Sequence, residues 1–190
     1  MQLKQPFFAR DTLKVARDLL GARLVRIEDG KRASGIIVET EAYRGEDDLG
    51  CHCSSGRTER TAVMYGPPGY SYVYFVYGMH WLLNFVTESE GFPGAVLIRA
   101  IIPDEGQEII AARREGRPRS EWTNGPAKLC QAMGITGQLN NHNICHPDAS
   151  IFVERGREIP DKLVSTTPRV GLDSVPEPWK TIPWRFVAEI

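Results

Sequence analysis

Residues 22–43 read ARLVRIEDGKRASGIIVETEAY, two runs of strand-forming residues on either side of Asp29-Gly30. An Asp-Gly pair favours the two-residue turn that joins neighbouring antiparallel strands, because both central residues need a positive φ. The sequence therefore predicts a β-hairpin with one strand over Ala22–Glu28 and a longer strand over Arg32–Tyr43. This hairpin favours an antiparallel sheet over a parallel one.

Outside the hairpin, strand patterns alternate with short helical patterns. Helices are predicted at Asp11–Leu20, ended by Gly21, at Asp104–Glu115, and from the start signal Asn124-Gly125-Pro126 to Met133. Further strands are predicted at Tyr70–Tyr77, Trp81–Thr87, Ala95–Ile102, Ile151–Arg155, Leu163–Gly171 and Trp184–Ile190. A polar loop is predicted from Arg44 to Thr61. We expect a mixed α/β (α+β) fold in one domain, residues 1–190, with helices beside an antiparallel sheet.

Length and composition favour a globular chain over a membrane or secreted one. A chain of 190 residues that is 42% hydrophobic can bury a core. Its most apolar run, Tyr72–Val86, contains Gly78, His80 and Asn84 and is shorter than the roughly 20 residues that cross a bilayer. The N-terminus lacks the apolar centre of a secretion signal. We expect a cytoplasmic monomer with no membrane partner.

The charge balance leaves nucleic-acid binding open. The net charge is −1, but binding depends on where positive residues gather rather than on their total. Two groups are visible in the sequence: Arg57 with Arg60, and Arg113 with Arg114, Arg117 and Arg119. A solvated loop and helix end would explain both groups, and the charges alone favour that explanation.

Two carboxylates in the longer strand of the hairpin are the first candidates for chemistry. Alternation puts two sets of side chains on opposite faces, Ile36, Val38, Thr40 and Ala42 on one and Ile37, Glu39, Glu41 and Tyr43 on the other. Carboxylates on an apolar strand are costly unless they are exposed, paired or functional. Arg99, a single charge in the apolar run Ala95–Ile102, is a candidate partner. A solvated edge strand would also explain the glutamates.

Aromatic residues form a second candidate feature. Tyr70, Tyr72 and Tyr74 share one face of a predicted strand, and Tyr77 lies on the other face, just before Gly78. Tyrosine is common in strands, so a structural role is sufficient to explain it. In a functional role, flat aromatic faces would stack on a nucleobase, and a tyrosine at a turn would wedge into a duplex.

Cysteine and histidine residues form a third candidate. Cys51-His52-Cys53 and Cys145-His146 offer sulfur and nitrogen ligands for a tetrahedral zinc ion. Paired cysteines of zinc sites are usually two to four residues apart, so a single intervening residue argues against this interpretation. We expect reduced thiols and no metal. A small zinc-dependent protein remains an alternative that metal analysis would separate.

Taken in order, these segments resemble the alkyladenine DNA glycosylase family, also called 3-methyladenine DNA glycosylases. The matching stretches are Val38–Tyr43, Tyr72–Tyr74, Tyr77–Met79, Asn84, Val96–Ala100, Gly125–Ala132, Arg169–Leu172 and Pro183–Phe186. The resemblance covers nearly the whole chain, whose length is that of the compact bacterial members. It implies a curved antiparallel sheet with a protruding hairpin, and no metal or cofactor.

The resemblance also assigns roles to single residues. Glu41 matches the general base that activates the attacking water, and Arg99 matches the arginine that helps to hold that water. Alternation alone leaves Glu39 as an equal candidate for the base. In the implied base-binding pocket, Tyr43 and Tyr74 sandwich the flipped base and His52 lines the same pocket. Asn84 excludes bases with an exocyclic amino group, and the backbone carbonyl of Val170 touches the water.

The remaining expectations concern DNA. Tyr77 matches the side chain that intercalates to fill the gap in the duplex, and Arg57, Arg60 and Lys128 are candidate contacts to the DNA backbone. After Val170 the chain reads Val175–Trp179, VPEPW, where family members often have Ala-Gly-Glu-Trp.

The resemblance implies a monofunctional DNA glycosylase acting on double-stranded DNA in base excision repair, which would place the protein at the nucleoid when it is bound. Its substrates would be alkylated or deaminated purines of the 3-methyladenine, 7-methylguanine, hypoxanthine and ethenoadenine class. No lysine is placed to attack the sugar, so we expect an abasic product without strand cleavage. A non-catalytic binder of damaged DNA is the alternative, although the Glu41–Arg99 pair counts against it.

Overall fold

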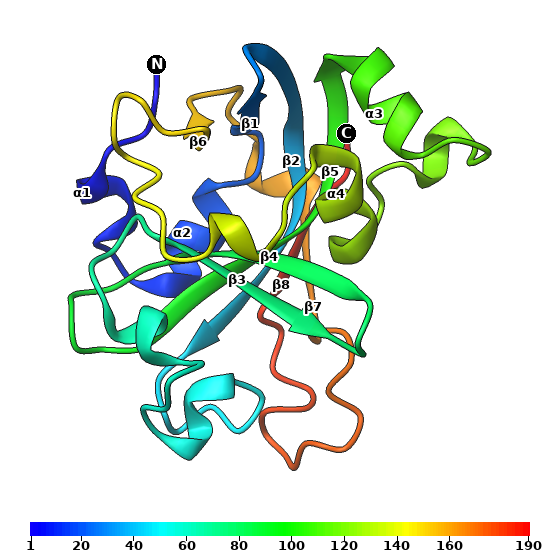
Figure 1. Cartoon of the computed structure of the whole chain (residues 1–190). Helices are drawn as coiled ribbons and strands as arrows, with labels where there is room; N and C mark the ends of the chain where they lie inside the picture. The colour runs from blue at the N-terminus through cyan, green and yellow to red at the C-terminus, as the bar shows by residue number, and fades with distance from the viewer.

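One eight-stranded antiparallel sheet forms the centre of the molecule (Figure 1). The computed structural model describes all 190 residues. The strands are β1 (Arg23–Glu28), β2 (Lys31–Arg44), β3 (Ser71–Val76), β4 (His80–Val86), β5 (Gly94–Glu105), β6 (Ile151–Glu154), β7 (Val164–Thr167) and β8 (Arg185–Ala188). Their order is β3-β4-β5-β2-β1-β6, with β8 beside β2 and β7 beside β8. The expected mixed α/β fold with an antiparallel sheet is confirmed.

The hairpin β1–β2 forms as the sequence predicts and organises the sheet. Asp29 and Gly30 have φ angles of 50° and 71°, and Glu28 pairs with Lys31 across the turn. Further along, β2 lies between β5 and β8, so that Glu41 pairs with Leu97 on one side and Arg185 on the other. The strand that carries the two glutamates is therefore central, and their explanation as residues of a solvated edge is wrong.

Strict alternation fails in the middle of β2. The β2–β5 register shifts between Ile37 and Glu39 and again between Glu39 and Thr40. Such irregularities insert an extra residue into one strand and turn the side chains that follow, often next to functional sites. The predicted division of residues 36–43 into two faces therefore does not hold across Val38.

Four α-helices pack on the sheet: α1 (Gln5–Phe8), α2 (Thr12–Asp18), α3 (Gln107–Arg113) and α4 (Pro126–Met133). The Asp11 side chain caps α2 by accepting hydrogen bonds from the backbone of Leu13 and Lys14. Gly134, with a φ of 63°, ends α4 as predicted. The sequence did not predict α1. None of the helices has the length and apolar character needed to cross a bilayer.

Short 3-10 helices interrupt the loops at His52–Ser55, Ala62–Tyr65, Arg119–Glu121, Gly137–Leu139 and Asp161–Leu163. The 3-10 helices His52–Ser55 and Ala62–Tyr65 lie in the long segment after β2 and contribute to a second, smaller hydrophobic core. Its buried members are Cys51, Cys53, Met64, Tyr65, Tyr72, Val86 and Ala95. This second core holds the segment after β2 against β3 and β4, beside the main core that α2 and α4 cover.

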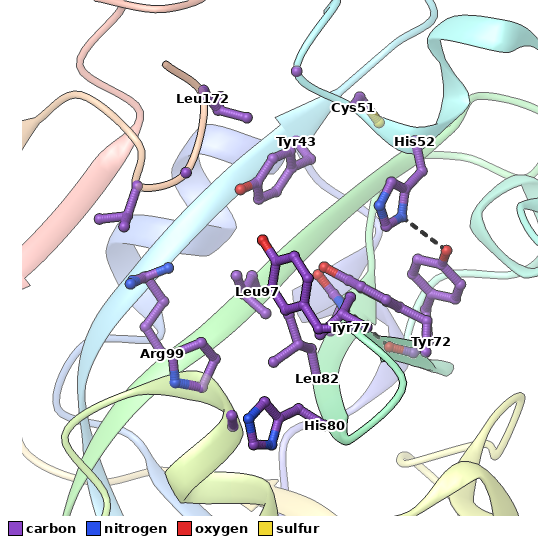
Figure 2. A pocket seen from close by; sticks show the side chains of 18 of the residues that line it. Tyr43, Cys51, His52, Tyr72, Tyr77, His80, Leu82, Leu97, Arg99 and Leu172 are labelled. Atoms are coloured by element: carbon purple, nitrogen blue, oxygen red, sulfur yellow. Dashed lines mark hydrogen bonds between the residues drawn. The ribbon is translucent and has the colours of Figure 1, made fainter. Parts of the chain in front are cut away.

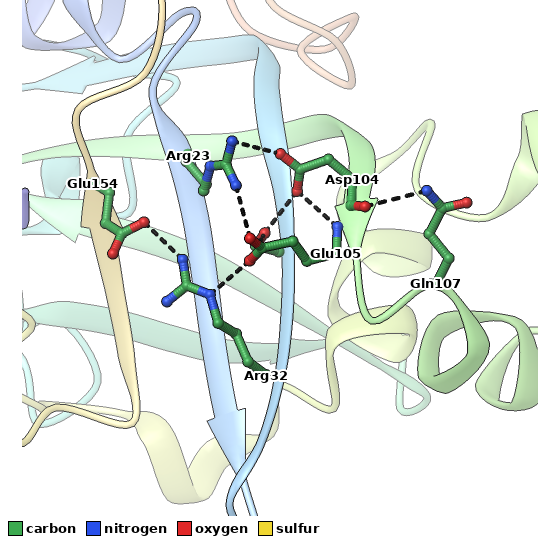
Figure 3. Close-up of polar contacts among 7 residues, drawn as sticks. Arg23, Arg32, Asp104, Glu105, Gln107 and Glu154 are labelled. Atoms are coloured by element: carbon green, nitrogen blue, oxygen red, sulfur yellow. Dashed lines mark hydrogen bonds and ion pairs between the residues drawn. The ribbon is translucent and has the colours of Figure 1, made fainter.

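A cluster of charged residues and one serine joins the first residues of β2 to the last residues of β5, and we call it the distal cluster (Figure 3). Its members are Arg23, Arg32, Ser34, Asp104, Glu105 and Glu154. The Arg32 guanidinium lies 2.6 Å from Glu105 and 2.7 Å from Glu154, and Arg23 lies 2.9 Å from Asp104. These contacts keep Asp104 and Glu105 in β5, which explains why α3 begins at Gln107 and not at the predicted Asp104.

The C-terminal strands are shorter than predicted. β7 ends at Thr167, and β8 covers only Arg185–Ala188. The chain leaves the sheet at Pro168, so Arg169 and Val170 lie in a loop and not in the predicted strand Leu163–Gly171. This loop returns to the second half of β2.

Candidate active site

A cavity of about 340 Å³ opens beside the second half of β2 (Figure 2). Segments far apart in the sequence line it, among them Tyr43, Cys51, His52, Tyr72, Tyr74, Tyr77, Asn84, Leu97, Arg99, Pro126, Ala127 and Val170. All five residues predicted for the base-binding pocket are among them. A volume of this size falls in the range of small-ligand sites, and its lining is largely aromatic and apolar with a few polar groups.

The Glu41 carboxylate lies directly behind the wall of this cavity and is completely buried. Its Oε1 accepts a hydrogen bond of 2.7 Å from the backbone N–H of Val170, and its Oε2 accepts one of 2.8 Å from the Tyr43 hydroxyl. Nη1 of Arg99 lies 3.2 Å from the same Oε2. Because a carboxylate oxygen offers about two acceptor positions, the single hydrogen bond to Oε1 leaves one position free there, while Oε2 holds both the hydroxyl hydrogen bond and the ion pair.

Glu39 has a different environment from Glu41. Its Oε1 accepts hydrogen bonds of 2.6 Å from Nε of Arg99 and 2.6 Å from Nε of Arg185. Arg99 therefore bridges the two glutamates, which confirms the prediction that they are its partners. Of the two guanidinium groups that hold Glu39, only that of Arg99 lines the cavity, whereas all three polar partners of Glu41 line it.

The tyrosines around the cavity stay protonated at neutral pH. Burial, and then the charge of Glu41, raises the pKa of Tyr43 well above its usual value, so its hydroxyl remains a donor to Glu41. Burial also raises the pKa of Tyr72 to about 12 and that of Tyr74 further. The rings of Tyr72 and Tyr74 lie 5.1 Å apart at an interplanar angle of 31°. The cavity thus has neutral aromatic walls.

His52 lines the cavity, edge-on to Tyr74 with 4.5 Å between ring centres. Its Nδ1 is 3.1 Å from the hydroxyl oxygen of Tyr72. Burial against these rings, followed by the charge of Arg60, lowers the pKa of His52 to about 4. The imidazole is therefore neutral at pH 7.

A buried ion pair that the sequence analysis missed ties the site together. Both Asp48 and Arg169 have fully buried side chains, and two hydrogen bonds of 2.5 and 2.7 Å join them. Arg169 also donates to the backbone carbonyl of Ala42 and lies 4.7 Å above the Tyr43 ring. It thereby fixes the loop that presents Val170 to Glu41. No local signal could have found a pair separated by 121 residues.

The turn between β3 and β4 carries Tyr77 at its tip, where 89% of the side chain is exposed. The β3–β4 hairpin projects from the edge of the sheet (Figure 1), as the resemblance implies. Tyr77 and Gly78 have φ angles of 52° and 66°. A positive φ is uncommon for a bulky residue and stores strain, which tends to persist at functional positions.

Of the three residues predicted to contact the DNA backbone, Arg60 and Lys128 lie next to cavity-lining residues, and Arg57 lies over Tyr65, which does not line the cavity. The guanidinium of Arg60 lies 5.2 Å over the Tyr74 ring, and that of Arg57 lies 5.8 Å over the Tyr65 ring. Lys128 contacts Asn124 and Glu121. It sits in the first turn of α4, whose Pro126 and Ala127 line the cavity.

The denser arginine group does not form a continuous positive patch. Arg113 pairs with Glu28, and Arg114 is buried against Gln131. Only Arg117 and Arg119 are exposed. Two members of this group therefore have structural roles.

The three cysteines considered as zinc ligands occupy two separate places. Cys51 and Cys53 belong to the small core, where the Cys53 thiol donates to the carbonyl of Gly45 over 3.1 Å. Cys145 lies beside Gly69. No three His, Cys, Asp or Glu side chains come together in a way that could hold a metal ion.

Comparison with known proteins identifies this combination of fold and cavity. The methylpurine-DNA glycosylase (MPG) family matches residues 6–189. Similar proteins named "Putative 3-methyladenine DNA glycosylase" include one from Methanocella arvoryzae, 48% identical over 97% of this chain and 90% of its own length. Others come from Myxococcus xanthus, 45% identical over 97% of this chain and 88% of its own, and Desulfitobacterium hafniense, 44% identical over 99% and 95%.

These matches make the protein a DNA glycosylase, a hydrolase that acts on N-glycosyl bonds and has DNA as its substrate. Within that class, the chain belongs to the methylpurine-DNA glycosylase family.

Proposed function

We propose that this glycosylase flips alkylated or deaminated purines out of double-stranded DNA and removes them with water activated by Glu41. The environment of Glu41 carries the proposal, because a buried carboxylate held by two hydrogen bonds and an ion pair stands at the wall of an aromatic cavity. Burying such a charge is costly, and groups of this kind gather at functional sites. The product would be an abasic site in base excision repair.

In the proposed reaction, the water oxygen attacks C1′ of the sugar while the bond from C1′ to the purine nitrogen breaks. The bonding electron pair leaves with the purine, and Glu41 takes a proton from the water. The negative carboxylate also stabilises the positive charge that develops on the sugar. The free acceptor position on Oε1 would accept a hydrogen bond from the water. Arg99, which contacts Oε2, would orient the carboxylate and the water.

The proposed base site lies between Tyr43 and Tyr74. A 3-methyladenine or 7-methylguanine base carries positive charge, and stacking it on neutral phenols is worth on the order of 1–2 kcal/mol when desolvated. Flipping costs a few kcal/mol, least for damaged bases, and so adds selectivity. Neutral hypoxanthine or ethenoadenine needs a hydrogen bond to the departing purine. With Tyr72 donating to its Nδ1, His52 would offer its Nε2–H for this purpose.

Other residues would position the nucleotide. The Asn84 side-chain amide donates to the backbone carbonyl of Tyr72 over 3.1 Å, which holds it in place to exclude bases with an extra amino group. The carbonyl of Val170 would contact the water, and Tyr77 would fill the gap in the duplex. Arg57 and Lys128 would contact the DNA backbone, so binding should fall steeply with salt.

The experiment uses labelled duplexes that contain a single hypoxanthine, ethenoadenine or 7-methylguanine. After incubation with the protein, hot alkali reveals abasic sites, and borohydride traps any covalent imine. We expect alkali-dependent cleavage and no trapped adduct. A protein that binds the lesion duplexes but leaves every base in place would be a damage-binding protein, and a trapped adduct would contradict the monofunctional mechanism.

A further inference from the structure

Each of the two tyrosines that would flank the damaged base has an arginine over its ring. Arg169 lies 4.7 Å from the centre of Tyr43, and Arg60 lies 5.2 Å from the centre of Tyr74. The Arg169 charge is balanced by the buried Asp48. No carboxylate lies within ion-pair distance of Arg60, so of these two arginines one has its charge balanced and the other does not.

The charge of Arg60 reaches the groups that line the cavity. It contributes to the low pKa of His52, and it opposes the rise that burial causes in the pKa of Tyr72 and of Tyr74. Three side chains at the proposed base site therefore experience the same positive charge. A base placed there would experience it as well.

We propose that Arg60 sets the preference of the enzyme between charged and neutral damaged bases, disfavouring the positively charged ones. This inference rests on the proposed function. A purine methylated at N3 or N7 carries one positive charge, which the transition state divides between base and sugar. For hypoxanthine or ethenoadenine, the charges on base and sugar sum to zero. The two classes thus differ by one positive charge along the whole reaction.

The size of the effect follows from the geometry. A base stacked on the face of Tyr74 opposite to Arg60 would place the two charges roughly 9 Å apart, given typical stacking distances. At an effective dielectric constant between that of water and that of a protein surface, this repulsion slows excision of a charged base about two- to fivefold relative to a neutral one. The side chain of Arg60 is exposed, so salt should reduce the effect.

The test is a competition between two labelled duplexes, one with 7-methylguanine and one with hypoxanthine, in a single reaction with limiting enzyme. With the two duplexes at equal concentrations, the ratio of their initial excision rates equals the ratio of their kcat/KM values. We expect Arg60→Gln to raise the 7-methylguanine to hypoxanthine ratio about two- to fivefold, more at low salt than at high salt. Arg60→Lys keeps the charge and should keep the wild-type ratio.

Arg57→Gln is the matched control, because it removes the same charge from the same loop but over Tyr65, a residue that does not line the cavity. It should leave the ratio unchanged, whatever it does to both rates together. If Arg60→Gln slows both lesions equally, Arg60 acts on the DNA backbone and the inference is wrong, while the proposed function stands. If the wild type excises neither lesion, the proposed function fails and the inference with it.

Discussion

The two ends of the strand pair β2–β5 carry the same kinds of side chain in different surroundings. At the distal cluster, the side chains of Arg32 and Glu105 are 35% and 45% exposed. At the cavity, those of Glu41 and Arg99 are 0% and 12% exposed. Solvated ion pairs contribute roughly 0–1 kcal/mol each, whereas a buried charge that loses its partner is costly. Burial and the surrounding donors, and not residue type, therefore distinguish the proposed catalytic cluster from the distal one.

The largest effect is expected for Glu41→Gln. An amide cannot take the proton of the water, so base release should fall about a thousandfold. The measurement is single-turnover release of hypoxanthine by chromatography, with urea unfolding to confirm that the variant folds. Release within tenfold of the wild type would show that Glu41 is not the base, and Glu39 would then be the candidate to replace.

The next largest effect is expected for Arg99→Met, which leaves two glutamates without their shared cation. Glu39 keeps Arg185, and Glu41 keeps the Val170 N–H and Tyr43. Losing the partner of a buried charge should lower the free energy of unfolding by about 3 kcal/mol. Losing a preorganised electrostatic contact should slow excision about a hundredfold. A variant that is destabilised but excises at the wild-type rate would make Arg99 purely structural.

Tyr77 gives an intermediate effect that separates function from stability. Tyr77→Ala and Tyr77→Gly both remove a stacking ring, so lesion-duplex binding should weaken about tenfold in each. At a φ of 52°, glycine is favoured over alanine, and the glycine variant should be more stable by about 1 kcal/mol. Titration by fluorescence anisotropy and urea unfolding measure the two quantities. Equal binding by wild type and both variants would exclude intercalation.

The smallest effect is expected for Glu105→Gln in the distal cluster. Hydrogen bonds from Arg32 and Ser34 lower the pKa of Glu105, so its stabilising contribution is present above the ordinary value of 4.5 and is lost as the pH falls through the lowered one. Wild type should be more stable by less than about 1 kcal/mol at pH 7, with the two proteins converging in acid. Excision should stay within twofold. A hundredfold loss would break the distinction between the two clusters.

Local signals account for much of what the sequence predicts correctly. Asp29-Gly30 specifies its turn, Asp11 caps α2, and Gly134 ends α4, because each acts through backbone conformation within a few residues. The resemblance then identifies five residues of a base-binding pocket, and all five line one cavity in the structure. Their individual roles stay predictions.

Long-range contacts account for most of what the sequence does not predict. β5 extends past Ile102 because Arg23 and Arg32, far away in the sequence, hold its last residues. Arg185 reaches Glu39 from 146 positions away, and Arg169 reaches Asp48 from 121. The irregular register near Val38 also depends on the neighbouring strands. Alternation therefore placed Glu39 and Glu41 together beside Arg99 but could not place Ile37, which is buried in the main core.

The most direct measurement of the central claim follows ethenoadenine fluorescence in a duplex mixed with wild type or Glu41→Gln, since this base changes its emission when it leaves the DNA stack. Both proteins should produce the same initial change as the base enters the cavity, and only the wild type should then release it. Release by Glu41→Gln at the wild-type rate, or no initial change with either protein, would contradict a cavity that accepts the flipped base and a Glu41 that activates the water.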